Sequence, residues 1–337
     1  MRRLSLTLSV LGLLCLLAAA VAAAERGRLV GGSSYALPGW FKQSFLELAD
    51  DASEAAEADK HVLLFMHLDG CPYCDAVLRE SLVGADYSAW LRQRFDVIAI
   101  NVRGSREVAF DATTRVSEKQ LAELLKVRQT PALIFLDGAN RQVLRLDGYR
   151  TPRDLKYALD YVDSKSYLKG SLPDFIARTA AGPHYTPRSH PAIRELTDLT
   201  RTDKPLLVLF EDAFCSACDL LHDTLFTDAE VNDLLEQLTV VRLDAESEAP
   251  LVDPAGRRTT AKAWSRELEL LARPSLLLFA GGEERVRIAG VLRHFHFVTA
   301  LRYVTNREYT RYPSLRDYSA AYTQQLFDAG IDIDVGR

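Results

Sequence analysis

The stretch LLFMHLDGCPYCDAVLRESL, residues 63–82, carries an unbroken apolar run into two cysteines that are separated by two residues. Nearly the same arrangement returns at residues 206–225, LLVLFEDAFCSACDLLHDTL. A short, continuous apolar run predicts a β-strand buried on both faces, and the amphipathic pattern after the cysteines predicts a helix. Both stretches therefore predict cysteines at the point where a buried strand passes into a helix.

A cysteine at the start of a helix is placed to react as a thiolate. The free N–H groups and the helix dipole stabilise negative charge there, which lowers the thiol pKa below its free value of about 8.5. The pattern predicts Cys71 and Cys215 as nucleophiles that attack a partner's disulfide. Cys74 and Cys218, one helical turn later, would resolve the mixed disulfides.

The second half of the chain repeats the first at a steady offset of 142–144 residues. LIFLDG at 133–138 matches LLLFAG at 276–281, and ALDYVDSKSY at 158–167 matches ALRYVTNREY at 300–309. The dipeptides Thr130-Pro131 and Arg273-Pro274 keep the same offset. A repeat this regular predicts tandem copies of one domain.

The predicted division of the chain follows from this repeat. An N-terminal segment at 25–39 precedes a first domain at 40–176, and a linker at 177–190 precedes a second domain at 191–320 with a tail at 321–337. Within the first copy we expect strands at 61–68 and 95–102, a hairpin at 131–149, and helices at 40–60, from residue 72, at 117–127 and at 151–164. Residues 107–116 form either a loop near the site or a surface excursion. This order predicts an α/β fold, a central mixed sheet flanked by helices.

The first 24 residues have the pattern of a secretory signal. Two arginines precede an apolar core, and three alanines end the segment at a predicted cleavage site after Ala24. An uncleaved membrane anchor is the alternative, since the core is long enough to span a bilayer. Apart from Cys15 in this leader, every cysteine lies in a C-x-x-C pair. We expect a periplasmic or secreted protein, in a compartment where disulfides persist unless they are reduced.

Composition excludes some classes of protein. With 48% hydrophobic and 26% charged residues, the chain is that of a folded globular protein. Its net charge of −5 argues against nucleic acid as a partner, because phosphate contacts need clustered Lys and Arg.

These features together resemble the thioredoxin fold: a buried strand that leads into C-x-x-C, an X-Pro dipeptide about 60 residues later, and a glycine that ends the hairpin. The sequence of residues 40–170, with the motifs HLDGCPYC, INVRG and VRQTPALIFLD, resembles the SoxW-type periplasmic thioredoxin-like proteins. The resemblance implies cis bonds before Pro131 and Pro274. It also implies that Thr130-Pro131 and Arg273-Pro274 dock an extended substrate beside the cysteines.

The chain departs from thioredoxin beside the cysteines. Thioredoxin has a buried aspartate six residues before the first cysteine, where this chain has Phe65 and Leu209. Thioredoxin's tryptophan four residues before that cysteine is replaced by His67 and Glu211. The resemblance therefore carries over neither thioredoxin's proton route nor its potential.

Several residues are expected to tune the two pairs: Pro72, Tyr73, His67, Asp75 and Asp219. Asp75 and Asp219 follow the second cysteine of each pair, where a negative charge weakens thiolate stabilisation. Arg273, if directed at Cys215, would oppose this effect at the second site alone. We therefore expect different redox potentials at the two sites.

Four histidines have competing interpretations. His67 either tunes the first site or is a plain packed histidine, and His222 is interpreted as a residue of a solvated helix face. His294 and His296 are either a metal pair or packed through the phenylalanines between and after them.

Static alternatives remain open for the cysteines. The pairs would be structural disulfides in a binding, scaffold or chaperone module, or would join in a four-thiolate zinc site, although zinc ribbons separate their pairs by only about 15–20 residues. The favoured interpretation is a thiol–disulfide oxidoreductase that acts on protein partners, with a membrane electron donor and an exported protein substrate. A disulfide isomerase is a further alternative. No metal or organic cofactor is expected, because electrons arrive by thiol exchange.

Overall fold

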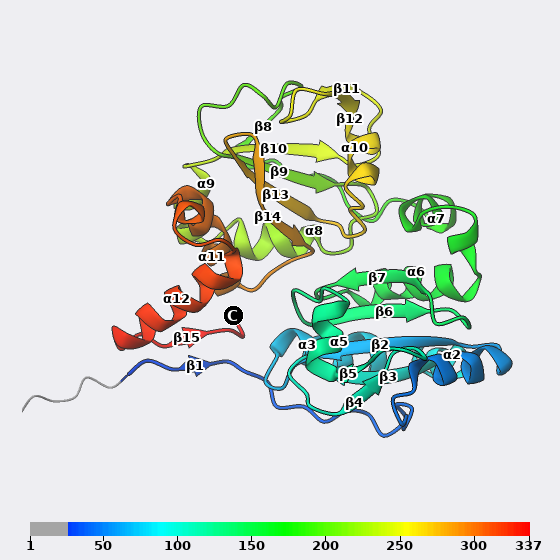
Figure 1. Ribbon diagram of the computed structural model, residues 1–337. Coiled ribbons are helices and arrows are strands. Elements are labelled where there is room, and N and C mark those ends of the chain that lie inside the picture. The colour runs from blue at the N-terminus through cyan, green and yellow to red at the C-terminus, as the bar shows by residue number, and fades with distance from the viewer. Residues whose placement is uncertain (1–25) are drawn as a thin grey trace, which may run out of the picture.

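A computed structural model describes residues 26–337. The expected signal segment, residues 1–24, lies outside the described residues. The first domain is built on a four-stranded sheet in the order β3-β2-β6-β7 (Figure 1). Its strands are β2 (His61–His67), β3 (Phe95–Asn101), β6 (Ala132–Leu136) and β7 (Gln142–Asp147). β2 and β3 are parallel, whereas β2–β6 and β6–β7 are antiparallel, so the expected mixed sheet is confirmed.

Helices cover both faces of this sheet. They are α2 (Leu48–Glu57), α3 (Pro72–Ala76) with its π-helical continuation (Val77–Val83), α4 (Ser88–Arg94), α5 (Glu118–Leu124), α6 (Pro152–Asp163) and α7 (Leu172–Thr179). Alternate residues of β2 serve opposite cores, because successive strand side chains point to opposite faces. Leu63 and Phe65 pack with both cysteines of the first pair. Leu64 and Met66 pack with α2 and α5 on the other face.

Two helix starts follow their predicted caps. The side chain of Ser117 accepts a hydrogen bond from the backbone N–H of Gln120, and the side-chain oxygen of Gln120 accepts one from the backbone N–H of Ser117. Thr151 caps α6, and Pro152 occupies the first turn, where its missing N–H costs nothing.

The helix predicted over 40–60 is shorter than expected and begins at Leu48. Leu46 has a φ of 62°, a left-handed conformation that interrupts a right-handed helix. The chain before it runs beside β3, where the Lys42 N–H donates to the carbonyl of Val97 at 2.8 Å, and Phe41 is buried in the core. Tertiary packing of these residues therefore overrides the amphipathic pattern.

Part of the insertion at 107–116 is a small hairpin. β4 (Glu107–Ala109) pairs antiparallel with β5 (Arg115–Ser117), and Val108 packs in the core beside α2 and α5. Buried Glu118, at the start of α5, anchors the approach to this hairpin by accepting from the side chain of Arg106 at 2.6 Å.

The second domain repeats this architecture around β9 (Leu206–Glu211), β10 (Thr239–Asp244), β13 (Ser275–Ala280) and β14 (Glu283–Ala289). The short β8 (Ile193–Arg194) extends the sheet to the order β14-β13-β9-β10-β8. β11 (Pro250–Val252) and β12 (Arg258–Thr260) form a hairpin that matches β4 and β5. The helices are α8 (Cys218–Leu220) with its π-helical continuation (Leu221–Leu225), α9 (Ala229–Leu235), α10 (Ala261–Glu267), α11 (His294–Thr305) and α12 (Leu315–Asp328).

The two ends of the described chain are tied together. β1 (Leu29–Val30) pairs in parallel with β15 (Ile333–Asp334), beside α12 and away from the two main sheets (Figure 1). The segment ahead of the first domain is thereby fastened to the tail that follows the second domain.

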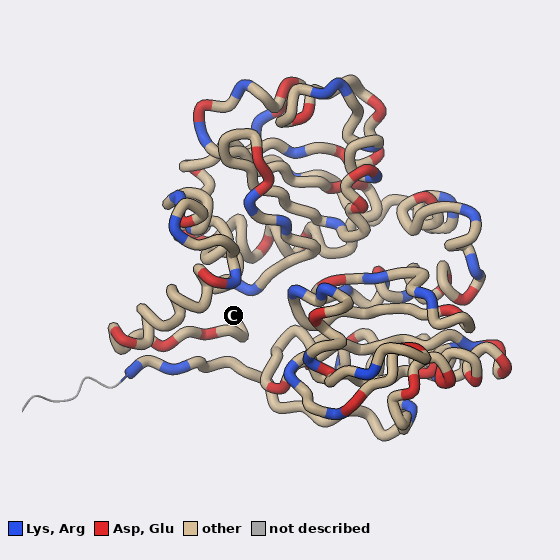
Figure 2. The backbone as a smooth tube through the Cα atoms, in the orientation of Figure 1, with Lys and Arg blue, Asp and Glu red and all other residues tan. Residues whose placement is uncertain are grey.

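The surface carries charges of both signs. Lys and Arg alternate with Asp and Glu over both domains in the described part of the chain (Figure 2). None of the helices within residues 26–337 combines the length and apolar character needed to cross a bilayer.

Truncating the core residue Phe135 should destabilise the first domain strongly. Phe135 is fully buried on the face of the sheet that carries the first cysteine pair. We expect Phe135→Ala to lower the free energy of unfolding by about 3–5 kcal/mol, through lost burial and the cavity left behind. Urea denaturation measures this, with Phe45→Ala as control because Phe45 is 96% exposed. Equal losses in the two variants would contradict the packing described above.

Candidate functional site

The first cysteine pair sits where β2 passes into α3. Gly70, with a φ of 78°, makes the turn after the strand, and Cys71 is the N-cap of the helix. The Cys71 sulfur accepts a hydrogen bond from the backbone N–H of Cys74 at 3.1 Å. Pro72 occupies the first helical turn. The sulfur therefore lies among helix N-terminal donors that favour a thiolate.

Both cysteine pairs are closed at disulfide distance within their own motifs. The Cα atoms are 5.3 Å apart for Cys71–Cys74 and 5.6 Å apart for Cys215–Cys218. All four residues are buried; Cys71 is 7% exposed and Cys215 only 1%. The first sulfur of site one is therefore the more accessible of the two nucleophiles.

The expected cis prolines are confirmed. Thr130–Pro131 and Arg273–Pro274 are both cis. At site one the Thr130 hydroxyl lies 3.5 Å from the Cys71 sulfur, and the Thr130 carbonyl oxygen lies 3.7 Å from it. The X-Pro dipeptide and the cysteine pair thus come together, as the resemblance implied.

Arg273 makes different contacts from those proposed for it. Its guanidinium donates to the Asp212 carboxylate at 2.7 Å and to the carbonyls of Leu270 and Ala272. Its charge is therefore paired with Asp212, which weakens the argument that Arg273 counteracts Asp219. The cation paired with Asp219 is Arg188 of the linker, at 2.5 Å.

Behind site one, His67 is buried and stacks on Phe65, with their ring centroids 5.6 Å apart. Its Nδ1 lies 3.0 Å from the hydroxyl of Tyr35, a residue of the N-terminal segment. Burial lowers the pKa of His67 below its ordinary value, so the neutral ring is favoured. Asp75 lies close enough to Tyr35 to raise the pKa of that phenol, after the larger effect of burial.

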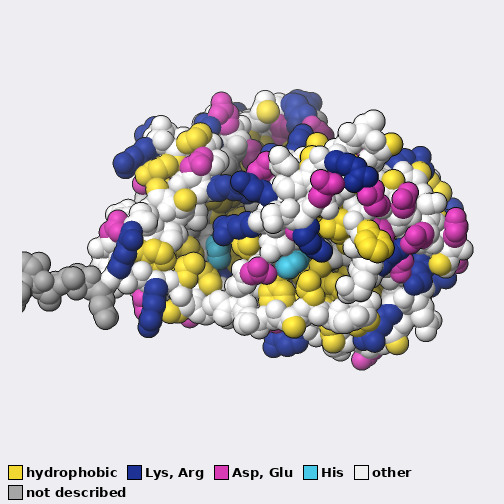
Figure 3. Space-filling view, turned by 60° about the horizontal axis from the view of Figure 1, so that its bottom comes forward, with side chains coloured by type: hydrophobic (Ala, Val, Ile, Leu, Met, Phe, Trp, Pro, Cys, Tyr) yellow, Lys and Arg dark blue, Asp and Glu magenta, His cyan; other side chains and the backbone are white. Residues whose placement is uncertain are grey.

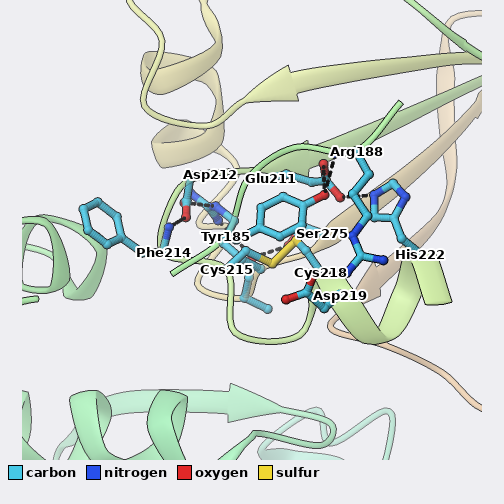
Figure 4. Close-up of a disulfide and its surroundings, with 12 residues drawn as sticks. Tyr185, Arg188, Glu211, Asp212, Phe214, Cys215, Cys218, Asp219, His222 and Ser275 are labelled. Carbon is cyan, nitrogen blue, oxygen red and sulfur yellow. Dashed lines mark hydrogen bonds and ion pairs between the residues drawn. A yellow bond between two sulfur atoms is a disulfide. The ribbon is translucent and has the colours of Figure 1, made fainter. Parts of the chain in front are cut away.

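Site two differs from the sequence-based interpretation at His222. This residue is 6% exposed rather than solvated, because its ring turns inward from the helix and lies 2.7 Å from Glu211 at the end of β9. Tyr185 of the linker donates to the other Glu211 oxygen at 3.1 Å and packs with both cysteines (Figure 4). Burial raises the pKa of Tyr185 well above its ordinary value.

Each C-x-x-C dipeptide contacts the opposite domain. The hydroxyl of Tyr73 accepts from the backbone N–H of Arg293 and lies 3.4 Å from Nδ1 of His296, at the start of α11. In the other direction, Asp154 of α6 faces Ser216, and burial raises the pKa of that carboxyl while the Ser216 hydroxyl opposes the rise.

These contacts are related by the sequence repeat. Position 154 in the first copy corresponds to position 296 in the second, at the offset of 142. The domains approach closely at Gly148 and Gly290, also an equivalent pair: a Cβ at Gly148 would lie 3.2 Å from the carbonyl oxygen of Ala289. Reciprocal contacts between equivalent surfaces indicate an approximate two-fold axis between the domains.

The cysteine pairs consequently face the domain interface. α8 lies on the side of the second domain that faces the first (Figure 1). A cavity between the domains is lined by Arg150 and Asp154 from one side and by Asp212 and Phe214 from the other. Figure 3 shows hydrophobic side chains gathered around histidines on one face of the molecule.

The histidine metal pair is not formed, because His294 and His296 point to different partners. His294 lies 3.0 Å from Asp228 and near Glu230. Arg337 and Arg302 already pair with these two carboxylates. His296 instead contacts Tyr73 across the domain interface. The structure therefore gives no support to a metal shared by the two histidines.

Comparisons with known proteins found one family model and a set of solved structures that match the chain. The model of the thioredoxin-like domain family matches residues 48–163 and 194–305, together more than half of the chain. A thioredoxin-fold protein from Helicobacter pylori is 20% identical over 36% of this chain and 84% of its own, with a TM-score of 0.32. A thioredoxin from Thermus thermophilus is 28% identical, with coverages of 34% and 84% and a TM-score of 0.28. The oxidised C-terminal domain of DsbD from Neisseria meningitidis is 17% identical, with coverages of 28% and 76% and a TM-score of 0.23. No curated protein matches the chain.

Proposed function

We propose that this chain, which belongs to the thioredoxin-like domain family, is an exported thiol–disulfide oxidoreductase that acts on proteins through its two C-x-x-C sites. One observation carries the proposal: in both copies a closed cysteine pair sits where a buried strand passes into a helix, in a domain whose X-Pro bond is cis. At site one a backbone N–H at the helix start is also aimed at the Cys71 sulfur, which a disulfide built only for stability does not need. In the second copy the helix begins at Cys218 instead, with Ala217 as its N-cap, so Cys215 precedes the helix.

The contacts at site one support Cys71 as the nucleophile. The Cys74 N–H and the Thr130 hydroxyl both lie within hydrogen-bond range of its sulfur, and both stabilise a thiolate. The Cys71 thiolate attacks one sulfur of a partner disulfide and releases the other as a thiol. Cys74 then attacks Cys71, which transfers two electrons in total to the partner.

The proposal extends to export, to the direction of electron transfer and to the partners. The leader at residues 1–24 supports export to the periplasm or beyond, and Asp75 beside the first pair supports a reductant, whereas Asp219 beside the second pair is paired with Arg188. A reductant outside the cytosol needs a supply of electrons, which we assign to a membrane electron donor, with an exported protein as the substrate. The SoxW-type resemblance of residues 40–170 points to the same role. The domain limits 40–176 and 191–320 remain part of the proposal.

A static disulfide is a competing function at site two alone. Tyr185 covers the Cys215–Cys218 pair, and Cys215 is nearly inaccessible. A binding module with one fixed disulfide would show the same burial.

Reactivity distinguishes the two functions. We expect a small dithiol to reduce both pairs rapidly, and the reduced protein then to reduce insulin with the appearance of insulin precipitate. Mass spectrometry after alkylation counts the reduced cysteines at each site. Pairs that stay oxidised in excess dithiol, or a reduced protein that leaves insulin intact, would contradict the oxidoreductase function.

A further inference from the structure

Glu211 and His222 form a buried carboxylate–imidazole pair beside the second cysteine pair. Glu211 ends β9 and is 1% exposed, and His222 lies on the π-helix that continues α8. Glu211 Oε1 and His222 Nε2 are 2.7 Å apart. The ring of Tyr185 lies beside the disulfide and its hydroxyl points to Glu211, while His222 projects from the helix that follows Cys218 (Figure 4).

Packing alone does not require this pair. The first domain has the same fold, and Leu78 occupies the position that corresponds to His222. Leu78 is 4% exposed, so an apolar residue fills this place well. Burying two ionisable groups instead carries a desolvation cost, which their mutual hydrogen bond has to offset. Buried ionisable pairs of this kind occur at functional sites, where burial and a charged partner prepare a group for proton transfer.

The helix places His222 next to the resolving cysteine. His222 follows Cys218 by four residues, and side chains at this spacing are neighbours on a helix, with about 5–6 Å between Cβ atoms. With Nε2 bound to Glu211, Nδ1 is the nitrogen left to accept a proton. A base oriented by a carboxylate beside a nucleophile is the arrangement that activates thiols and hydroxyls elsewhere.

Tyr185 shields this group and holds it. Its hydroxyl donates to Glu211 Oε2 at 3.1 Å, and its ring packs against both cysteines. The backbone N–H of Tyr185 donates to the carbonyl of Ala213, which fixes the linker over the site. Because Cys218 is fully buried beneath this ring, its proton needs an acceptor within the protein.

We propose that His222 accepts the proton of Cys218 during resolution of the mixed disulfide, and that Glu211 is the positioning residue that orients His222. This inference rests on the proposed exchange function and assigns an active role to site two.

The step balances without a further reagent. The Cys218 thiol gives its proton to His222, and its sulfur attacks Sγ of Cys215. The Cys215–Cys218 bond forms as the bond from Cys215 to the partner's sulfur breaks. The partner leaves as a thiolate and takes the proton from His222. The dithiol is oxidised by two electrons and the partner disulfide is reduced by two.

Other charged or titratable groups surround the pair and belong to the same electrostatic environment. They are Tyr185 and Arg188 in the linker, Arg242 in β10, Asp212 in the loop after β9 with its partner Arg273 before β13, and Asp219 and Asp223 in α8 and its π-helical continuation. Arg188 contacts both Asp219 and Asp223, so these acids are already paired with a cation.

The test uses the full chain with Cys71→Ser and Cys74→Ser, so that site two acts alone. A disulfide-bonded peptide is mixed with the reduced protein, and the rates of mixed-disulfide formation and resolution are measured separately between pH 6 and 9. We expect His222→Leu, which restores the residue of the first domain, to slow resolution about a hundredfold at pH 7. The deficit should shrink towards pH 9, as the free thiol ionises by itself with a pKa of about 8.5. Formation of the mixed disulfide should be unchanged.

Glu211→Gln provides the second variant, because it keeps the shape of the side chain and an oxygen that can accept from His222, while it removes the charge that orients His222. We expect an intermediate loss with the same pH dependence. His184→Leu is the control, since this linker histidine pairs with Tyr157 instead. Resolution rates in His222→Leu equal to those of the parent at every pH would overturn the inference. An unreactive site two in a chain whose site one exchanges would overturn it as well and leave the proposed function standing, whereas no exchange at either site would overturn both.

Discussion

Replacing Cys71 and Cys215 together by serine should reduce exchange with a protein disulfide to the uncatalysed rate. Serine keeps the size of the side chain, but a hydroxyl is not ionised near neutral pH and cannot form the mixed disulfide. The remaining cysteines, Cys74 and Cys218, are fully buried and cannot replace the lost nucleophiles. Insulin reduction by the prereduced double variant measures this loss.

The single variants separate the two sites. We expect Cys71→Ser to cause the larger loss, because Cys71 is more exposed than Cys215 and Tyr185 covers only the second pair. The matched control is Ser216→Ala, which changes the second motif and leaves both of its sulfurs in place. Activity in the double variant comparable to that of the unaltered chain would exclude these sulfurs as nucleophiles.

Local sequence patterns predicted the parts of the site that depend on neighbouring residues. The apolar run before Cys71, the serine cap of α5 and the proline in the first turn of α6 each specify a conformation within a few residues. The cis bonds at Pro131 and Pro274 came from the resemblance rather than from such a pattern, and they are confirmed. The repeat carried the buried strand, the cysteine pair and the cis proline into the second domain, but not the proline in the first turn of α6, because α11 begins at His294 without one.

The rest depended on contacts between distant segments. Helical spacing could not reveal that His222 turns inward, because its partner Glu211 lies on a different element and the sequence-based interpretation treated the two separately. Tyr185 was assigned to a linker, where composition says nothing of a buried ring over a disulfide. One signal was available: Glu211 is ionisable at the end of an expected buried strand, and His222 occupies the position of the apolar Leu78 in the first copy.

Local sequence patterns could not predict the interface between the domains either, but the repeat limits which residues can meet there. Two copies of one surface can meet through equivalent residues, so a contact from Tyr73 to the start of α11 predicts a matching contact from the second motif to the start of α6. The different residues at the equivalent positions 154 and 296 make each half of the interface chemically distinct. Each C-x-x-C motif thus contacts the other domain of the same chain, and a protein substrate can bind a motif only when these contacts are broken. We therefore expect the domains to move apart before a protein disulfide reaches either pair.

Truncating Tyr73 should open this interface and expose the other site. Tyr73 lies between the cysteines of site one, and its ring contacts His296 and the guanidinium of Arg293 in the second domain. Loss of a central aromatic anchor costs about 2 kcal/mol, which is about a thirtyfold shift in the closed–open equilibrium. We expect Tyr73→Ala to enlarge the radius of gyration and to accelerate alkylation of Cys215 and Cys218 after reduction.

Measuring site two separates opening from a change in redox potential, because Tyr73→Ala leaves the second motif unaltered. Tyr167→Ala is the matched control: it truncates a partly buried tyrosine of the same domain that contacts His61 instead of the second domain. It should change neither the radius nor the alkylation rate. Tyr73→Phe should lie between the two, since it keeps the ring over Arg293 and loses only the hydroxyl that meets the start of α11. Alkylation at site two that is equally slow in all three variants would show that the contact of Tyr73 does not hold the domains closed.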